Sequence, residues 1–187
     1  MSQVLTDGND ELGTAGTTAG TVYALDGNDR LYGIGVGGTY AYWYGGNGQD
    51  ALLYQGATYT NLYGGDGNDT LHGNSASHDW LYGENGDDLI SSGQFVWSTA
   101  HTTGQVVLLG GYVSGNDYLD GGQGRDALYG FDGADTLYGG DGDDTGTINV
   151  ADAVTIGTTM SVQAGLYGGS GDDWIDGGRG NDYIEGG

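Results

Sequence analysis

Aspartates that follow a glycine two positions earlier recur along this 187-residue chain at a nearly constant step. Glycine takes positive φ angles freely, so a glycine-rich turn can aim several backbone carbonyls at one centre, to which an aspartate adds a carboxylate. Calcium takes about six to eight oxygens of these two kinds. The sequence therefore predicts calcium-binding turns, and the predicted metal ligands are eleven aspartates that end a Gly-x-Asp triplet and recur at this step: Asp10, Asp29, Asp50, Asp69, Asp88, Asp117, Asp126, Asp135, Asp144, Asp173 and Asp182.

The steps between these aspartates indicate a repeat architecture. They are 19, 21, 19, 19, 29, 9, 9, 9, 29 and 9 residues, close to nine or to multiples of about nine or ten. A fixed step of this kind is typical of solenoids. The steps near 19 predict acidic turns on one side of the first half and plainer turns on the other. The steps of nine from Asp117 to Asp144 predict acidic turns on both sides.

Short strands must position these turns. We call each of these eleven aspartates a marker aspartate. An apolar residue stands two places after the marker aspartate in ten of the eleven copies. The exception is Asp144, because Gly146 stands two places after it. A three-residue strand points its middle side chain to the opposite face from its neighbours, so this residue is predicted to face inward. Similar strands are expected at 42–44, 61–63 and 80–82. One such unit cannot bury its apolar residue alone, whereas stacked coils can.

The repeats resemble the nonapeptide of the RTX (repeats-in-toxin) family, Gly-Gly-x-Gly-x-Asp-x-apolar-x. The copies that carry the resemblance are GGDGNDTLH from Gly64, GGQGRDALY from Gly121, GGDGDDTGT from Gly139, GGSGDDWID from Gly168 and GGRGNDYIE from Gly177. The resemblance implies an all-β, right-handed parallel β-roll, or β-solenoid, with calcium between same-side turns. It also implies folding outside the cell after bacterial type I export. The roll is expected to form one domain over 1–187, with irregular insertions at about 91–107 and 146–165.

Composition limits the partners of this chain. Its formal net charge is -23, from 26 acids against three arginines, and it contains no cysteine. A compact chain with that charge repels itself and needs cations, and about eight to ten calcium ions at the acidic turns would cancel most of it. Nucleic acid and anionic membranes are unfavourable partners. Because no apolar stretch is long enough to span a membrane, no membrane insertion is expected.

Three further patterns leave alternatives open. Tyrosines one place after an inward residue predict outward ladders, which stabilise the sheet or offer a surface for lateral assembly or glycan contact. Asp141 to Asp152 has the spacing of an EF-hand-type loop, a rival to the roll at that point. His72, His78 and His101 are scattered and are interpreted as surface residues in turns.

No Ser-His-Asp order, phosphate loop or zinc pattern stands out, so the chain is not expected to be an enzyme.

Three functions are consistent with these observations. The first is an extracellular calcium-binding structural protein that self-associates head-to-tail, through uncapped coil ends, into a filament, surface layer or matrix. RTX proteins usually carry a capping and secretion region after the repeats, whereas this sequence stops at Gly186 and Gly187, where another repeat begins. The second function is therefore a calcium-dependent folding and secretion module of a larger toxin, enzyme or adhesin. An ice-binding solenoid is a weaker third, because the outward residues are tyrosine and not regular threonine.

Overall fold

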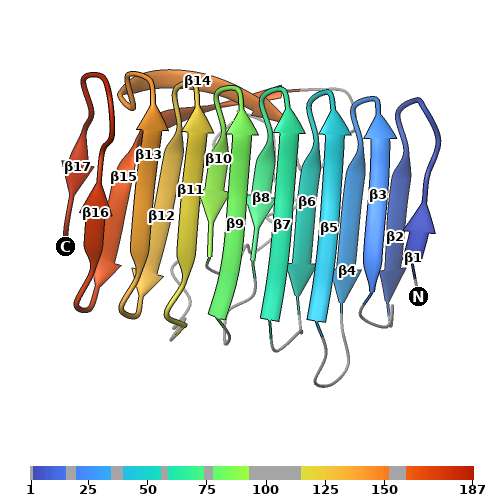
Figure 1. The fold of residues 1–187 in the computed structure, drawn as a ribbon, viewed down its shortest axis with the longest axis horizontal. Helices are drawn as coiled ribbons and strands as arrows, with labels where there is room; N and C mark the ends of the chain where they lie inside the picture. The colour runs from blue at the N-terminus through green and yellow to red at the C-terminus, as the bar shows by residue number, and fades with distance from the viewer. Residues whose placement is uncertain are drawn as a thin grey trace.

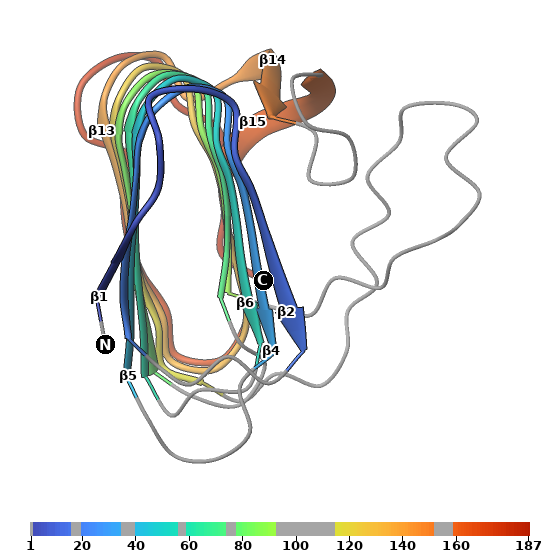
Figure 2. The same cartoon turned by 90° about the vertical axis from the view of Figure 1, so that its right-hand side faces the viewer.

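The chain winds into a flattened solenoid in which two parallel β-sheets face each other across one core (Figures 1 and 2). The computed structural model describes residues 2–15, 20–34, 40–55, 59–73, 78–92, 115–151 and 159–187. Those residues contain strands and turns and no helix, which confirms the all-β prediction.

The front sheet faces the viewer in Figure 1, and the back sheet lies behind it. In spatial order, the front sheet consists of β1 (Ser2–Val4), β3 (Thr21–Asp26), β5 (Tyr40–Asn47), β7 (Tyr59–Asp66), β9 (His78–Asn85), β11 (Tyr118–Gln123), β13 (Thr136–Asp141) and β16 (Trp174–Asp176). The back sheet consists of β2 (Glu11–Ala15), β4 (Arg30–Ile34), β6 (Ala51–Gln55), β8 (Thr70–His72), β10 (Leu89–Ser91), β12 (Ala127–Asp132) and β15 (Thr159–Ser170), with β17 (Ile184–Glu185) beside β15.

Parallel pairing in register stacks equivalent residues of successive coils. In the front sheet, Trp43 pairs with Leu62 and Leu62 with Leu81, while in the back sheet Leu52 pairs with Leu71. The predicted inward residues therefore meet in a single core. Those that are fully buried are Leu31, Leu52, Leu71, Ile90, Leu119, Leu128 and Leu137. Each contributes about 1.5–3 kcal/mol relative to an exposed side chain. Leu12 and Ile175 are partly buried against this core, and Ile184 is 48% exposed, because β17 is the outermost strand of the back sheet.

The back sheet is also buried on its outward side near its middle. All three residues of β8 and all three of β10 are inaccessible to solvent. His72 ends β8 with only 1% exposure, and burial lowers its pKa to about 3. The interpretation of His72 as a surface residue in a turn is therefore wrong, because the residue lies within a strand that is covered on both faces. His78 is exposed at the start of β9, and His101 lies outside the described residues.

Tyrosines form the predicted ladders on the outward faces. In the front sheet, Tyr23, Tyr44, Tyr63 and Tyr82 stack with ring centroids 4.9, 4.7 and 4.9 Å apart and interplanar angles of 11°, 5° and 6°. Such pairs contribute about 0.5–1.5 kcal/mol each beyond the area they bury. Because the rings stack on one another, their faces are covered, and the ladder presents ring edges and hydroxyls to solvent.

One of the two expected insertions contains an antiparallel arm. β14 (Gly146–Ala151) pairs with the first half of β15, from Gly146 opposite Ala164 to Ala151 opposite Thr159. The EF-hand-type alternative over Asp141 to Asp152 does not fit this arrangement, because residues 146–151 are an extended strand and no described helix flanks them. Of the other expected insertion, 91–107, residues 93–107 lie outside the described ranges.

Candidate metal centre

Eight aspartates form a continuous column along one edge of the roll, the upper edge in Figure 1. The backbone N–H of each, except the last, donates to Oδ1 of the aspartate in the next coil, for example Asp50 to Asp69 and Asp69 to Asp88, both at 2.8 Å. These residues are called the first column: Asp10, Asp29, Asp50, Asp69, Asp88, Asp126, Asp144 and Asp182.

A shorter second column lines the opposite edge. It consists of Asp79, Asp117, Asp135 and Asp173, joined by the same N–H to Oδ1 hydrogen bonds at 2.8, 2.9 and 3.0 Å. From Asp117 to Asp144 the aspartates alternate between the two columns, as the steps of nine predict. All eleven predicted ligands thus stand in one of two columns.

Asp79 is the column residue that the triplet pattern missed. Ser77, and not glycine, stands two places before it, so no Gly-x-Asp triplet marks it. The remaining signal was its position two residues before the inward Leu81. Thr60 stands at the same place one coil earlier, and its N–H donates to Oδ1 of Asp79 at 3.2 Å.

Glycines make room for the carboxylates. A Cβ at Gly64 would collide with Oδ2 of Asp69 and would lie 2.7 Å from the carbonyl oxygen of Gly83 in the next coil. The next residue, Gly65, adopts a φ of 114°, in the region that side chains disfavour. The paired glycines therefore bring a carboxylate oxygen and a carbonyl oxygen of the next coil close together. The same crowding recurs at Gly45, Gly83, Gly121, Gly130, Gly139 and Gly168.

One oxygen of most column carboxylates is buried and has no hydrogen-bond partner. A buried carboxylate oxygen without a partner is costly, and a cation removes the cost. This orphaned oxygen is Oδ2 in nine of the twelve column residues: Asp29, Asp50, Asp69, Asp88, Asp117, Asp126, Asp135, Asp144 and Asp173. These sites therefore fit a hard cation such as calcium, which accepts carboxylate and carbonyl oxygens.

Burial raises the pKa of the column carboxyls. Desolvation is the largest cause and brings the pKa of Asp50 to about 7 and that of Asp126 to about 8. The pKa of Asp69 and that of Asp88 also lie well above the ordinary value, because burial is reinforced by the neighbouring aspartates of the column. Without a cation, the ionised form of these groups is therefore disfavoured in the fold.

The columns differ from a metal site built of clustered side chains. Among the described residues, no three His, Cys, Asp or Glu side chains gather around one point. Calcium does not require such a cluster, because backbone carbonyls complete its coordination.

At the start of the first column the arrangement changes, since both Oδ atoms of Asp10 accept hydrogen bonds from Thr6, including one from its N–H at 2.7 Å.

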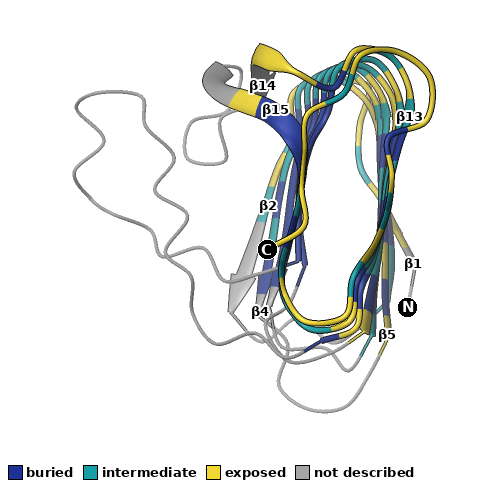
Figure 3. Ribbon diagram, turned by 90° about the vertical axis from the view of Figure 1, so that its left-hand side faces the viewer, coloured by how far each residue is buried: buried dark blue, intermediate teal, exposed yellow. Residues whose placement is uncertain are grey.

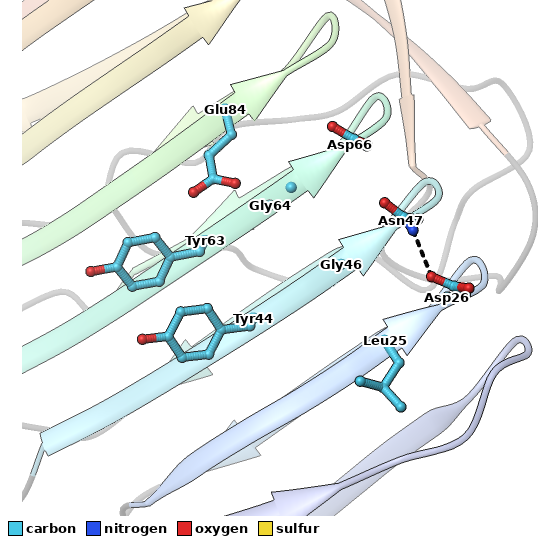
Figure 4. A pocket seen from close by; sticks show the side chains of 10 residues that line it. Leu25, Asp26, Tyr44, Gly46, Asn47, Tyr63, Gly64, Asp66 and Glu84 are labelled. Atoms are coloured by element: carbon cyan, nitrogen blue, oxygen red, sulfur yellow. Dashed lines mark hydrogen bonds between the residues drawn. The ribbon is translucent and has the colours of Figure 1, made fainter.

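Other positions of the turn form ladders that separate like charges. Asn47 donates to Asp26 at 2.6 Å, and Asn85 donates to Asp66 at 2.8 Å, so an amide alternates with a carboxylate along this separate row of the turns. Figure 4 shows the pair formed by Asn47 and Asp26 at the turns beyond the tyrosine ladder. Further along, Arg179 pairs with Asp141 at 3.1 Å. These exposed contacts reduce repulsion between stacked turns.

Comparison with known families decides what these repeats are. The RTX calcium-binding nonapeptide repeat matches the chain in four copies, over residues 14–33, 63–95, 113–145 and 166–187. The chain belongs to the RTX repeat family. Its RTX repeats are calcium-binding units, and the parallel solenoid is the β-roll that the resemblance implied. No curated protein and no solved structure matches the chain. The described residues contain no helix that is long and apolar enough to cross a membrane.

Replacing Gly64 by alanine tests the crowding inside one RTX turn. Because the new methyl group would displace Asp69 and the Gly83 carbonyl, Gly64→Ala should destabilise the calcium-loaded chain by about 1–3 kcal/mol. Gly8→Ala is the control, since a Cβ at Gly8 meets nothing within 4 Å, and its effect should stay within about 1 kcal/mol. Thermal unfolding in saturating calcium measures both, and equal effects would contradict the assignment of crowding to Gly64.

Low pH should partly stabilise the fold when calcium is absent. A carboxyl whose folded pKa is raised stabilises the fold below its unfolded pKa of about 4, and this contribution is lost as pH rises through the folded pKa. For Asp50 and Asp126 that loss falls between pH 4 and the folded values of about 7 and about 8. In chelator, circular dichroism should therefore show more β-structure at about pH 5 than at about pH 8. With calcium the slope should reverse, because protons then compete with the metal. A calcium-free signal that does not change with pH would contradict this expectation.

Proposed function

We propose that this chain is an extracellular calcium-binding structural protein, in which the two aspartate columns hold the calcium ions that keep successive coils together. The observation that carries the proposal is the row of buried Oδ2 atoms without partners beside backbone carbonyls. The proposed ligands are the eleven predicted aspartates together with Asp79. Asp10 contributes least, because Thr6 already occupies its carboxylate. Folding outside the cell, after type I export, would expose the chain to abundant calcium.

We further propose that copies of the chain associate head-to-tail through their terminal coils. At one end Val4 of β1 is 62% exposed, and at the other Trp174 of β16 and Ile184 of β17 are 50% and 48% exposed. Figure 3 looks onto the second end, where the last coil is largely exposed. Strands at a sheet edge present unpaired N–H and C=O groups that template pairing with another chain. Because the two ends differ, such a contact does not close on itself and runs on as a filament.

Electron microscopy and sedimentation of the purified chain, with and without calcium, test this assembly. Filaments that form with calcium and disappear with chelator are expected. Ile184→Lys places a charge on the terminal coil and should shorten or abolish the filaments, whereas Tyr40→Lys, at a site of similar exposure on β5 inside the front sheet, should not. A folded monomer at saturating calcium would overturn the assembly and leave the second function, a calcium-dependent folding and secretion module of a larger protein. An ice-binding role has little support, since the stacked outward residues of the front sheet are tyrosines.

A further inference from the structure

The front sheet carries a second outward row beside the tyrosine ladder, and this row is interrupted at Asn61. Pairing in register places Tyr42 of β5, Asn61 of β7 and Trp80 of β9 at equivalent positions of three successive coils. The two aromatic residues therefore stand on either side of a coil that offers only a short amide side chain. Tyr42 is 38% exposed, among the more accessible large side chains of the sheet.

This interruption leaves an open slot in the surface. Strands in a sheet are about 4.8 Å apart, so Tyr42 and Trp80 are separated along the roll by roughly 9.6 Å, twice that spacing. A groove lies over Asn61 and is lined by Tyr40, Tyr42, Tyr59, Asn61, Trp80 and Tyr82. Tyr59 closes one side of the groove, because its ring stacks with that of Trp80 at 6.0 Å and with that of Tyr40 at 5.2 Å between centroids. Five aromatic side chains thus surround a space with an amide at its floor.

A comparable interruption further along the sheet is filled by the protein itself. Asp120 replaces the tyrosine that would continue the ladder beyond Tyr82. There Tyr118 tilts into the gap, with centroids 5.6 Å from Tyr82 and 5.4 Å from Tyr138, and its hydroxyl donates to Asp120 at 3.3 Å. Over Asn61 the lining aromatic residues leave the groove open. The slot over Asn61 is therefore available to a ligand.

We propose that this slot binds a methylated ammonium cation, such as a trimethylammonium group. A cation is attracted to the face of tryptophan or tyrosine when it lies within about 6 Å of the ring centroid. A group seated over Asn61 lies about one strand spacing, ~4.8 Å along the roll, from the strand of Tyr42 and from the strand of Trp80. The Asn61 amide oxygen can point its dipole toward the positive charge. Methylation makes the cation poorly hydrated, so it enters an aromatic slot more readily than a bare ammonium.

The electrostatic surroundings favour a cation over other flat or compact ligands. No arginine lines the slot, and the chain has only three against 26 acids. A phosphate-bearing or carboxylate-bearing ring would be repelled by this excess of negative charge. A neutral sugar gains no such attraction, and the regular ladder beside the slot offers it ring edges in place of open faces. The charge of the chain and the aromatic side chains that line the slot together point to a cationic ligand.

Titration of the calcium-loaded full chain with choline, followed by calorimetry or by NMR shifts, tests the proposal. The neutral isostere 3,3-dimethylbutan-1-ol has the same shape without the charge and should bind at least about tenfold more weakly. Asn61→Tyr fills the slot with a ring that continues the row, so it should abolish choline binding while the chain stays folded. Thr21→Tyr is the matched control, because it adds a ring at the other side of Tyr42, outside the slot, and should leave binding unchanged.

Three results would overturn the proposal. Equal binding of choline and its neutral isostere would show that charge is not recognised. Choline binding that survives in Asn61→Tyr would place the ligand elsewhere. Saturable binding of a neutral disaccharide at the slot, with none of choline, would assign it to a glycan. None of these outcomes depends on whether the chain forms filaments.

Discussion

Removal of calcium at neutral pH is expected to abolish most of the β-structure of the chain. The fold buries a row of carboxylates whose Oδ2 atoms have no partner, and successive coils repeat the same negative charge at each edge. Without a cation, each buried charge keeps its desolvation cost and repels the next. When a metal site forms only in the folded state, the binding free energy is folding free energy. Chelation should therefore unfold the roll, and not only remove calcium from a roll that stays folded.

Circular dichroism and hydrogen exchange before and after addition of a calcium chelator measure this effect, and re-addition of calcium should restore the signal. Magnesium serves as the control cation, because it demands nearly octahedral geometry and retains its waters, so it should not restore the fold. A spectrum that chelator leaves unchanged would show that the columns are stable without metal and would contradict the expectation.

The second large effect is expected from one carboxylate of the first column. Asp88→Asn keeps the Oδ1 acceptor for the Asp69 N–H but removes the charge that attracts calcium. Loss of one partner from a buried ionic contact costs about 3–5 kcal/mol. For a chain of this size, 3 kcal/mol lowers Tm by roughly 6–12 °C. The destabilisation applies to the calcium-loaded chain.

Asp87 provides the matched control in the same turn. Its Oδ1 accepts the Arg125 N–H at 2.8 Å, and an asparagine does the same at Asn28 and Asn68 in other coils. Asp87→Asn makes the same change of charge one residue away and should alter Tm little in calcium. Equal shifts for the two variants in calcium would contradict the role of Asp88.

Much of this architecture could be predicted because the repeat couples local chemistry to packing. The marker aspartate, the glycine pair and the apolar residue each occupy a fixed place, so Leu71 and Asp69 were assigned to core and turn from spacing alone. The alternation of columns after Asp117 followed from the steps of nine. The periodic pattern of the sequence therefore predicts the features that recur in every coil.

Features that belong to a single coil could not be predicted in this way. Asp79 occupies a column position without its glycine, since the turn before it departs from the motif. The burial of His72 depends on what lies outside the back sheet, which the spacing of the repeats does not encode. The slot over Asn61 exists only because three particular strands pair in register, so no local pattern marks it.

The hydrogen bonds that join each column aspartate to the next coil also determine how the roll should respond to force. Each coil is held by its neighbours alone, through the N–H to Oδ1 contacts of its column aspartates, one strand pair on each face and the proposed calcium ions. Tension applied to the ends should therefore peel coils off singly, as in one-dimensional repeat proteins. Each 19-residue coil would release roughly 65 Å of chain at about 3.4 Å per residue. In calcium the coils from Asp10 to Asp88 would therefore come off in nearly equal steps, whereas the later coils that carry an insertion would give longer ones, and chelation would remove the resistance to extension.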